Sequence, residues 1–338
     1  MSLRIAIIDS EICNSVAIAD DRNITNYYIS DNKIVRKTIK GIFSSHGTDV
    51  LNNILYECKD IEIISIEVLS SDNKGKVVDL LRAIDFCIQK EISFINISLG
   101  IITQNSKLIN ALKKVCERAV EKGIIIISAM SNKEGKSYPA AFDFVTAVSS
   151  STVNKEYINY NEKENEICFC SSNVFSKGHG KYIINTGNSY LSGYVTGVFC
   201  SLINKNIENK EKVLGFWGNS EKINKIFVNP FNENEFNKEV TLVYFEQNSF
   251  DTYLEKHINA NVKKVNWLVI KEKKYFNTDT IIFGNLKLPC KKKIKKEIIQ
   301  WLIYMNISQI YCLVPIFNTI ERYQIVRKYN ISIKTVYI

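Results

Sequence analysis

The sequence has neither a long apolar run nor an export signal. None of its hydrophobic segments approaches the roughly 20 residues of a membrane-spanning helix, so we expect no membrane partner. The segment Met1–Asp9 lacks the charged start, long apolar stretch and small-residue cleavage site that together mark a signal peptide. Because a candidate functional residue already stands at position 9, we expect no pro-segment before it. These absences favour a cytoplasmic protein.

Metal-binding spacing is also missing. The nine cysteines are scattered, and the closest pair, Cys168 and Cys170, lacks the spacing of a zinc site. Without an export signal, they fit reduced thiols in a reducing compartment. No acidic loop has calcium-ligand spacing, and the C-terminal half has no glycine-rich phosphate loop. We therefore expect no cofactor and no metal site, and leave calcium open without an assignable site.

Basic residues are unevenly distributed along the 338 residues, whose net charge is +9. Residues 1–205 hold 23 basic and 22 acidic residues, whereas residues 206–338 hold 21 and 13. A basic half can bind nucleic acid or an acidic peptide, or it can be a solvated lysine-rich surface. We prefer the solvated surface and keep an acidic peptide as the second interpretation. Nucleic acid is the least favoured partner, because no recognised binding motif is present.

Residues 1–150 alternate apolar runs with amphipathic segments. The runs are rich in Ile and Val and nearly continuous, as in parallel strands buried on both faces. This alternation predicts an α/β fold with a doubly wound, mostly parallel sheet, whose site lies beyond the carboxyl ends of the strands. The expected strands are 3–8, 61–69, 93–99, 123–130 and 144–149, and the expected helices are 48–58, 76–90 and 106–122.

The rest of the chain divides into three stretches. Residues 151–186 are polar and are predicted to be irregular, and a helix from about Ser189 to Asn204 follows. Residues 206–238 are rich in Asn, Lys and Glu and are predicted to link a first domain, 1–205, to a smaller α/β accessory domain, 239–338. The accessory domain is expected to have strands at 240–245, 265–270, 280–283, 310–314 and 333–337, and helices at 250–258, 291–305 and 319–329.

Four short segments carry the groups that acyl transfer by a serine nucleophile requires. In chain order they offer the carboxylate of Asp9, the imidazole of His46, the amide of Asn132 and the hydroxyl of Ser189. Each segment lies at the end of a predicted strand or the start of a predicted helix. Each motif alone is weak, because an Asp-Ser turn or a Gly-x-Ser sequence is common. Their joint occurrence in this order is the informative signal.

Residues 1–204 resemble the catalytic domain of the subtilisin-like serine peptidases, whose triad has the same Asp, His, Ser order. Asp9 in IIDS and His46 in SHGTDV match two motifs of that family, and GNSYLSGYVTG at 187–197 matches its serine motif. Asn132 and the Tyr-Pro pair at 138–139 match the oxyanion asparagine and the segment after it. The sequence NISLG at 96–100 matches the strand that pairs with bound substrate.

The resemblance implies a serine endopeptidase that acts on a peptide or protein. In this family pattern, Ser189 is the nucleophile, His46 the general base and then acid, and Asp9 the group that orients the imidazole. Asn132 and the Ser189 backbone N–H would form the oxyanion hole. The remaining implied substrate-binding residues are Ser98, Leu99 and Gly100 along the peptide, and Lys133 and Ser137 near the primary specificity pocket. From Lys133 and Ser137 we expect a mild preference for a polar or acidic residue before the cut.

The chain departs from the family pattern near these residues. Glu11 and Ser131 stand where the family usually has Gly, and Gly193 stands where it has Pro. Leu51-Asn52 likewise replace Ala-Gly after the histidine. These changes alter local backbone geometry without removing a reacting group. Of the other histidines, His179 is interpreted as a loop residue and His257 as structural.

We therefore expect a dedicated intracellular processing protease. One hypothesis is leader-peptide removal during maturation of a ribosomal peptide, with the basic accessory domain docking an acidic leader. The alternative is a catalytically silent scaffold that keeps the fold for peptide binding or signalling. The natural substrate, the cleavage specificity and the oligomeric state stay open at this point.

Overall fold

The computed structural model describes residues 3–13, 24–38, 45–70, 72, 74–132, 135–151, 158–178, 181–210, 212–219, 223, 240–244, 265–269, 280–284, 299, 309–312 and 317–335. The chain divides into two compact units, one of residues 1–154 and 158–218 and the other of residues 155–157 and 219–338. In the described parts of the chain, no helix combines the length and the apolar character that a membrane crossing requires.

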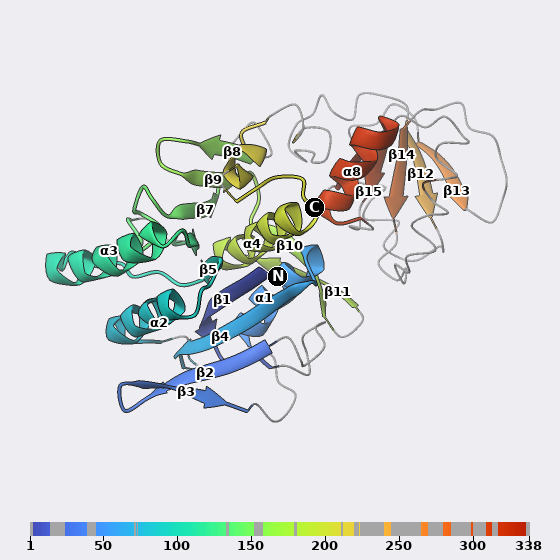
Figure 1. The fold of residues 1–338 in the computed structure, drawn as a ribbon. Helices are drawn as coiled ribbons and strands as arrows, with labels where there is room; N and C mark the ends of the chain where they lie inside the picture. The colour runs from blue at the N-terminus through green and yellow to red at the C-terminus, as the bar shows by residue number, and fades with distance from the viewer. Residues whose placement is uncertain are drawn as a thin grey trace. The chain divides into compact units, whose positions relative to one another are not determined.

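A nine-stranded α/β sheet forms the centre of the first unit (Figure 1). Its order is β3-β2-β4-β1-β5-β6-β7-β9-β8, and neighbours are parallel except for the outer pairs β2–β3 and β8–β9. β4 and β5 lie on opposite sides of β1. The order in which successive strands join the sheet therefore reverses at β1 and creates a switch point at its carboxyl end. The strands are β1 Leu3–Ser10, β2 Ile24–Ser30, β3 Lys33–Lys37, β4 Ile61–Leu69, β5 Phe94–Ile97, β6 Ile125–Ala129, β7 Thr146–Ser150, β8 Ile158–Asn161 and β9 Glu166–Phe169.

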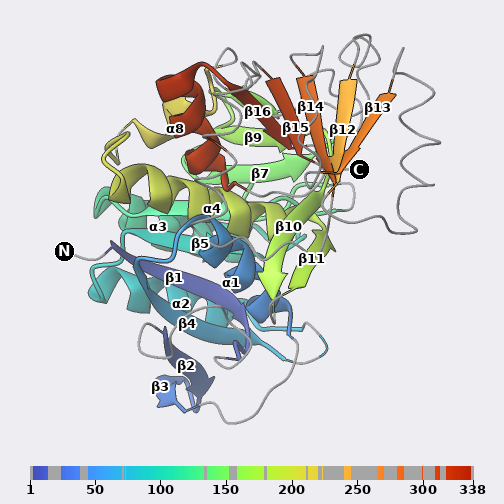
Figure 2. The same cartoon turned by 90° about the vertical axis from the view of Figure 1, so that its right-hand side faces the viewer.

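Helices cover both faces of this sheet (Figures 1 and 2). On one face, α2 (Val77–Gln89) packs with α3 (Ser106–Glu121), and on the other α1 (His46–Glu57) packs with α4 (Asn188–Asn204). Strand β1 serves both faces, because successive side chains alternate. Ala6 and Ile8 lie in the core with α2 and α3, so Asp9 points to the face of α1.

Two glycines of α4 allow the close approach of α1. A Cβ atom at Gly193 would lie 2.9 Å from the Val50 carbonyl oxygen, and one at Gly197 would lie 2.6 Å from the Ile54 carbonyl oxygen. Both distances are shorter than real Cβ contacts allow. The replacement of the family proline by Gly193 therefore serves the packing of the two helices.

Most expected elements of the first unit are present, with ends that differ by a few residues. The prediction that residues 151–186 are irregular was wrong, because β8, β9 and an antiparallel pair, β10 (Asn173–Gly178) and β11 (Lys181–Thr186), lie there. The hairpin of β2 and β3 was also not anticipated. These strands are the outermost two at each end of the sheet or form a separate pair, and they lack the apolar run that marks a central strand.

The start of the expected linker is structured. Val213–Phe216 form a 3₁₀ helix, η2, and Val213, Phe216 and Trp217 are buried. The Trp217 ring contacts the rings of Phe169 and Tyr194 at centroid distances of 5.8 and 6.4 Å. Aromatic packing therefore joins residues up to 217 to the first unit, beyond the expected boundary at 205.

The second unit contains a five-stranded parallel sheet in the order β13-β12-β14-β15-β16. One helix, α8 (Thr319–Tyr329), precedes β16, and a capping box of Asn318 and Glu321 starts it. The expected helices 250–258 and 291–305 fall outside the described residues, apart from residue 299. The strands are β12 Val240–Tyr244, β13 Val265–Val269, β14 Thr280–Gly284, β15 Gln309–Cys312 and β16 Ser332–Thr335.

Replacement of Gly197 by Ala tests the close contact of α1 and α4. We expect Gly197→Ala to lower the free energy of unfolding by about 1–3 kcal/mol through overpacking, although Ala is the better helix former. The matched control is Gly215→Ala in η2, where a Cβ meets nothing within 4 Å. Urea unfolding measures the free energy of unfolding of both variants. Equal values for Gly197→Ala and Gly215→Ala would contradict a tight contact between α1 and α4.

Candidate active site

Three strand ends and two helix starts of the first unit meet at one edge of the sheet. Asp9 ends β1, Ser98 follows β5, and Asn132 follows β6. The first turns of α1 and α4 bring His46 and Ser189 to the same edge. Parallel strands place their carboxyl ends together, so residues distant in sequence become neighbours here.

Asp9 and His46 form a direct pair. The Nδ1 atom of His46 lies 2.8 Å from Oδ1 and 3.0 Å from Oδ2 of Asp9. The Asp9 side chain is fully buried, and the Ser10 backbone N–H also donates to Oδ1 at 2.6 Å. A buried carboxylate is stable only with such partners. The pair fixes the imidazole so that Nδ1 faces Asp9 and Nε2 is left for another partner.

The surroundings of His46 raise its pKa. Burial lowers the pKa of the imidazole, but the hydrogen bond and charge of Asp9, helped by the charge of Asp49, outweigh that effect. Asp49 lies three residues after His46 on α1, so the two share a helix face. Burial in turn raises the pKa of Asp49, and the charge of His46 opposes that rise.

Short polar contacts tie the segment after Asp9 to the start of α1. The Ser45 hydroxyl caps the helix by accepting from the Thr48 N–H at 3.2 Å, and it donates to the Glu11 carbonyl oxygen at 2.5 Å. The Gly47 N–H donates to the Ser10 hydroxyl at 3.0 Å. A Cβ at Gly47 would lie 2.6 Å from the Ser10 carbonyl oxygen, so only glycine permits this approach.

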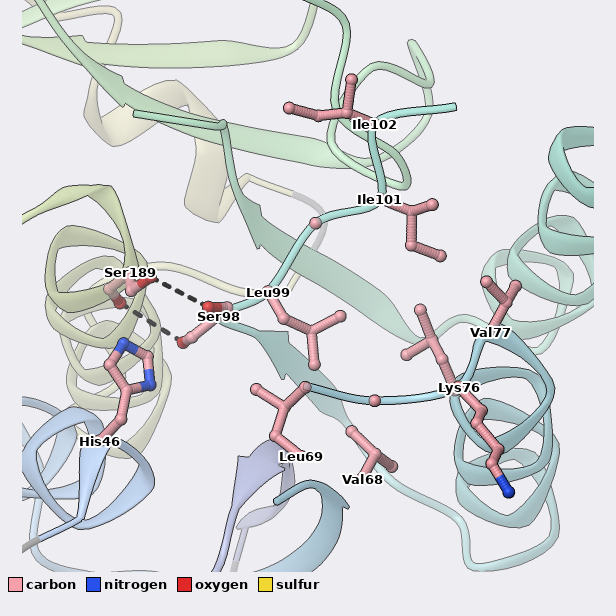
Figure 3. Close-up of a pocket in the computed structure, with 13 residues that line it drawn as sticks. His46, Val68, Leu69, Lys76, Val77, Ser98, Leu99, Ile101, Ile102 and Ser189 are labelled. Atoms are coloured by element: carbon pink, nitrogen blue, oxygen red, sulfur yellow. Dashed lines mark hydrogen bonds between the residues drawn. The ribbon is translucent and has the colours of Figure 1, made fainter. Parts of the chain in front are cut away.

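The Ser189 hydroxyl donates to the Ser98 carbonyl oxygen at 2.9 Å (Figure 3). The Ser98 hydroxyl contacts the Ser189 carbonyl oxygen at 3.3 Å and Asn96 Oδ1 at 2.7 Å. Between the described residues Ser189 and His46 there is no hydrogen bond, although both line one cavity. The nucleophile candidate is therefore held at the segment that follows β5, in the cavity that His46 also lines.

Two N–H donors converge near Ser189. The Asn132 Oδ1 atom accepts from the Asn188 N–H at 3.2 Å, which leaves the amide NH₂ group for another acceptor. The Ser189 N–H lies in the first turn of α4, where backbone donors lack acceptors within the helix. Gly187 has φ of 140°, and a Cβ there would lie 3.7 Å from Asn132 Nδ2. Glycine is therefore required beside the amide.

A cavity of about 510 Å³ extends from His46 and Ser189 along residues 98–102 (Figure 3). Its walls combine polar and apolar surface, and Val77 and Leu80 of α2 contribute to the apolar part. Leu99 and Gly100, two of the residues predicted to bind substrate, line it. The lining comprises His46, Val68, Leu69, Gly75, Lys76, Val77, Leu80, Ser98, Leu99, Gly100, Ile101, Ile102 and Ser189.

Ser137, expected at the specificity pocket, is fully buried and does not line this cavity. Its hydroxyl lies so close to Gly100 that a Cβ at position 100 would collide with it. Ser137 thus packs against Gly100 on the side away from the cavity. Lys133, His179 and His257 lie outside the described residues.

The other departures from the family pattern leave the site intact. Ser131 does not have a positive φ, so its backbone needs no glycine. Glu11 provides a carbonyl acceptor for Ser45 and an ion pair with Lys37. Leu51 and Asn52 are buried within α1.

Six of the seven cysteines whose side chains the structure describes are buried. Burial raises the pKa of the Cys58 thiol to about 11, with smaller opposing effects from its hydrogen bonds. Searching only the described residues finds no group of three His, Cys, Asp or Glu side chains placed to hold a metal ion.

Sequence reasoning missed three residues that contact the site. Asp49 could have been found from its i,i+3 spacing to His46. Tyr190 could not, because its ring meets the His46 ring only in the fold, at a centroid distance of 5.2 Å. The Asn53 amide donates to the Tyr190 carbonyl oxygen at 3.3 Å and joins α1 to α4 beside the nucleophile candidate.

A buried Asp–His pair and a serine at a helix start, brought to one edge of the sheet, are the kinds of side chain that hydrolases with a serine nucleophile use. Residues 2–222 match the subtilase family, and the chain belongs to that family. It is 26% identical over 212 residues to the minor extracellular protease Epr of Bacillus subtilis, covering 60% of this chain and 32% of that protein. It is 26% identical over 223 residues to subtilisin E of the same organism, covering 60% and 56%.

The same fold occurs in the epidermin leader peptide processing serine protease of Staphylococcus aureus, with a TM-score of 0.51 and 17% identity. That match covers 68% of this chain and 70% of the other. The present chain thus spans about a third to just over half of the length of the first two curated relatives.

The charge of Asp49 offers a direct test of the electrostatics around His46. Because a negative charge favours the protonated imidazole, Asp49→Asn should lower the pKa of His46, while the Asp9 contact persists. An NMR titration of His46 measures this shift, and His46→Gln assigns the signal. Asp85→Asn on α2 is the control and should leave the titration unchanged. An unchanged pKa in Asp49→Asn would contradict the expectation.

Proposed function

We propose that this chain is a serine endopeptidase in which Asp9, His46 and Ser189 form the catalytic triad and Asn132 completes the oxyanion hole. The observation that carries the proposal is the Asp9–His46 pair at 2.8 Å, with Ser189 lining the same cavity. Family membership and the resemblance of the four motifs agree with it.

Acylation begins when the Ser189 hydroxyl turns from the Ser98 carbonyl to Nε2 of His46. Catalytic hydrogen bonds are often incomplete without substrate and form in the complex. His46 accepts the proton as Ser189 Oγ attacks the scissile carbonyl carbon. Asp9 stabilises the imidazolium that results.

The tetrahedral intermediate carries its negative charge on the former carbonyl oxygen. The Asn132 NH₂ group and the Ser189 N–H donate to that oxygen, and the N-terminal dipole of α4 adds a small favourable field. His46 then protonates the leaving amine, and the C–N bond breaks. Water, deprotonated by His46, hydrolyses the acyl-enzyme and restores Ser189.

Residues 98–100 would pair with an extended peptide by strand addition. Leu99, Gly100 and the apolar walls formed by Val77 and Leu80 suit a substrate with an apolar side chain in the cavity. The preference for a polar or acidic residue before the cut now depends on Lys133 alone, since Ser137 is buried.

The finer hypothesis is leader-peptide removal in the cytoplasm, with residues 239–338 docking an acidic leader. Its support is the charge of the chain, since residues 206–338 hold 21 basic and 13 acidic residues. Calcium has no assignable role in this scheme.

The second candidate is a silent peptide-binding scaffold. The observation that favours it is the bond from the Ser189 hydroxyl to the Ser98 carbonyl oxygen in place of His46. A scaffold of this kind would bind a peptide in the cavity without cleaving it.

Labelling with a fluorophosphonate separates the two candidates. We expect the wild-type protein to be labelled and Ser189→Ala to remain unlabelled, because the reagent reacts with an activated serine. Ser176→Ala, on β10, is the control and should label normally. A folded wild-type protein that binds peptide without labelling would support the scaffold.

Removal of the oxyanion amide should slow turnover with little effect on substrate binding. Asn132→Ala is expected to lower kcat by about 10²–10³-fold, the range seen when an oxyanion-hole donor is removed from a subtilisin. Steady-state kinetics on a peptide substrate measure it. A kcat within twofold of wild type would exclude Asn132 from the oxyanion hole.

Charge reversal tests the docking hypothesis in the full-length chain. The triple variant of Lys291, Lys292 and Lys293 to Glu should lower kcat/KM for acidic peptides and weaken its salt dependence. Cleavage of a short neutral peptide should not change. The control reverses the exposed residues Lys107, Lys113 and Lys114 on α3. Equal effects of the two triple variants would exclude specific docking by the second unit.

A further inference from the structure

A lysine beside the site bridges two carboxylates from different elements. Lys37 Nζ, at the end of β3, lies 2.6 Å from Glu11 Oε1 and 2.9 Å from Glu67 Oε2 of β4. All three side chains are about two-thirds buried, at 31%, 29% and 28% exposure for Lys37, Glu11 and Glu67. Partial burial makes such a pair stronger than an exposed one and makes its loss costlier.

Glu11 is linked to both members of the Asp9–His46 pair. It follows Asp9 by two residues, and its carbonyl oxygen accepts from the hydroxyl of Ser45, which caps α1 just before His46. Movement of Glu11 would therefore displace the Asp9 segment and the start of α1 together. Its side chain has one described ionic partner, Lys37.

Without Lys37, the carboxylates of Glu11 and Glu67 would face each other unneutralised. Burial lowers the pKa of the Lys37 ammonium, but its hydrogen bonds to Glu11 and Glu67 and their charges outweigh that effect and raise the pKa. Two unneutralised carboxylates repel each other, so loss of the Lys37 ammonium would push Glu11 away from Glu67. The bridge thus holds Glu11 against β4.

We propose that Lys37, through Glu11 and Glu67, is a positioning residue that holds Asp9 and His46 in register for catalysis. This assignment rests on the proposed function of the Asp9–His46 pair. It also gives Glu11 a role at the position where the subtilase pattern usually has glycine. Misplacement of a catalytic group by about 1 Å can cost about 10²-fold in rate, so a remote bridge can matter.

The test replaces Lys37 by Met in the full chain. We expect kcat to fall by about 10- to 100-fold with KM within about twofold, because the pair is misplaced while the cavity is kept. Lys37→Arg, which keeps the charge and the donors, should restore most of the rate. Lys113→Met, which breaks an exposed ion pair with Glu117 on α3, is the matched control and should behave as wild type.

An NMR titration of His46 tests the positioning role independently of enzyme activity. The ionisable groups around His46 are Asp9 from β1, Asp49 from α1 and Tyr190 from α4. Loosening of the Asp9 contact lowers the pKa of His46, so the acid limb of the kcat/KM profile should move to lower pH. If Lys37 acted on His46 only through its positive charge, removal of that charge would raise the pKa of His46 instead.

A kcat near wild type, or an upward shift of the His46 pKa, in Lys37→Met would overturn the proposal. If Lys37→Met does not fold, Glu11→Gln replaces it, since that variant keeps the Lys37–Glu67 pair, and an unchanged kcat there has the same meaning. A wild-type protein without fluorophosphonate labelling would remove the proposed function. The His46 titration would still decide whether Lys37 positions the pair.

Discussion

The buried carboxylate of Asp9 is the constraint on which the rest of the site depends. A fully buried charge is costly unless it is paired, and its partners are the His46 imidazole and the Ser10 N–H. The imidazole can reach Asp9 only because α1 begins beside the end of β1. The Ser45 cap and the glycine at position 47 allow that placement. The same pairing raises the pKa of the imidazole, so geometry and basicity have one origin.

The nucleophile candidate reaches this pair because α4 packs closely against α1. Gly193 and Gly197 remove the side chains that would otherwise separate the two helices. The close approach brings the Tyr190 ring to His46 and lets Asn53 bind the Tyr190 carbonyl oxygen. A substitution that looks like a lost family feature, Gly193 for proline, is therefore part of the packing that assembles the site.

The central strands and the four motif residues could be predicted because their signals are local. Apolar runs mark β1, β4, β5, β6 and β7, and each motif follows a strand or opens a helix. The short strands β8 and β9 at the end of the sheet lack that signal, since they have no long apolar run. Tyr190 and Lys37 were missed because their partners lie far away in sequence. Ser137 matched a motif, yet the fold buries it behind Gly100.

The protonation of His46 decides which acceptors are open to the Ser189 hydroxyl. A doubly protonated imidazole has no acceptor, so the hydroxyl must donate elsewhere, and the Ser98 carbonyl oxygen lies 2.9 Å away. Only the neutral ring offers Nε2 as an acceptor. Because Asp9 and Asp49 raise the pKa of His46, the protonated form persists to higher pH than for an ordinary histidine. The bond to Ser98 and the bond to His46 are thus alternative states of one hydroxyl, and the charge on the imidazole selects between them.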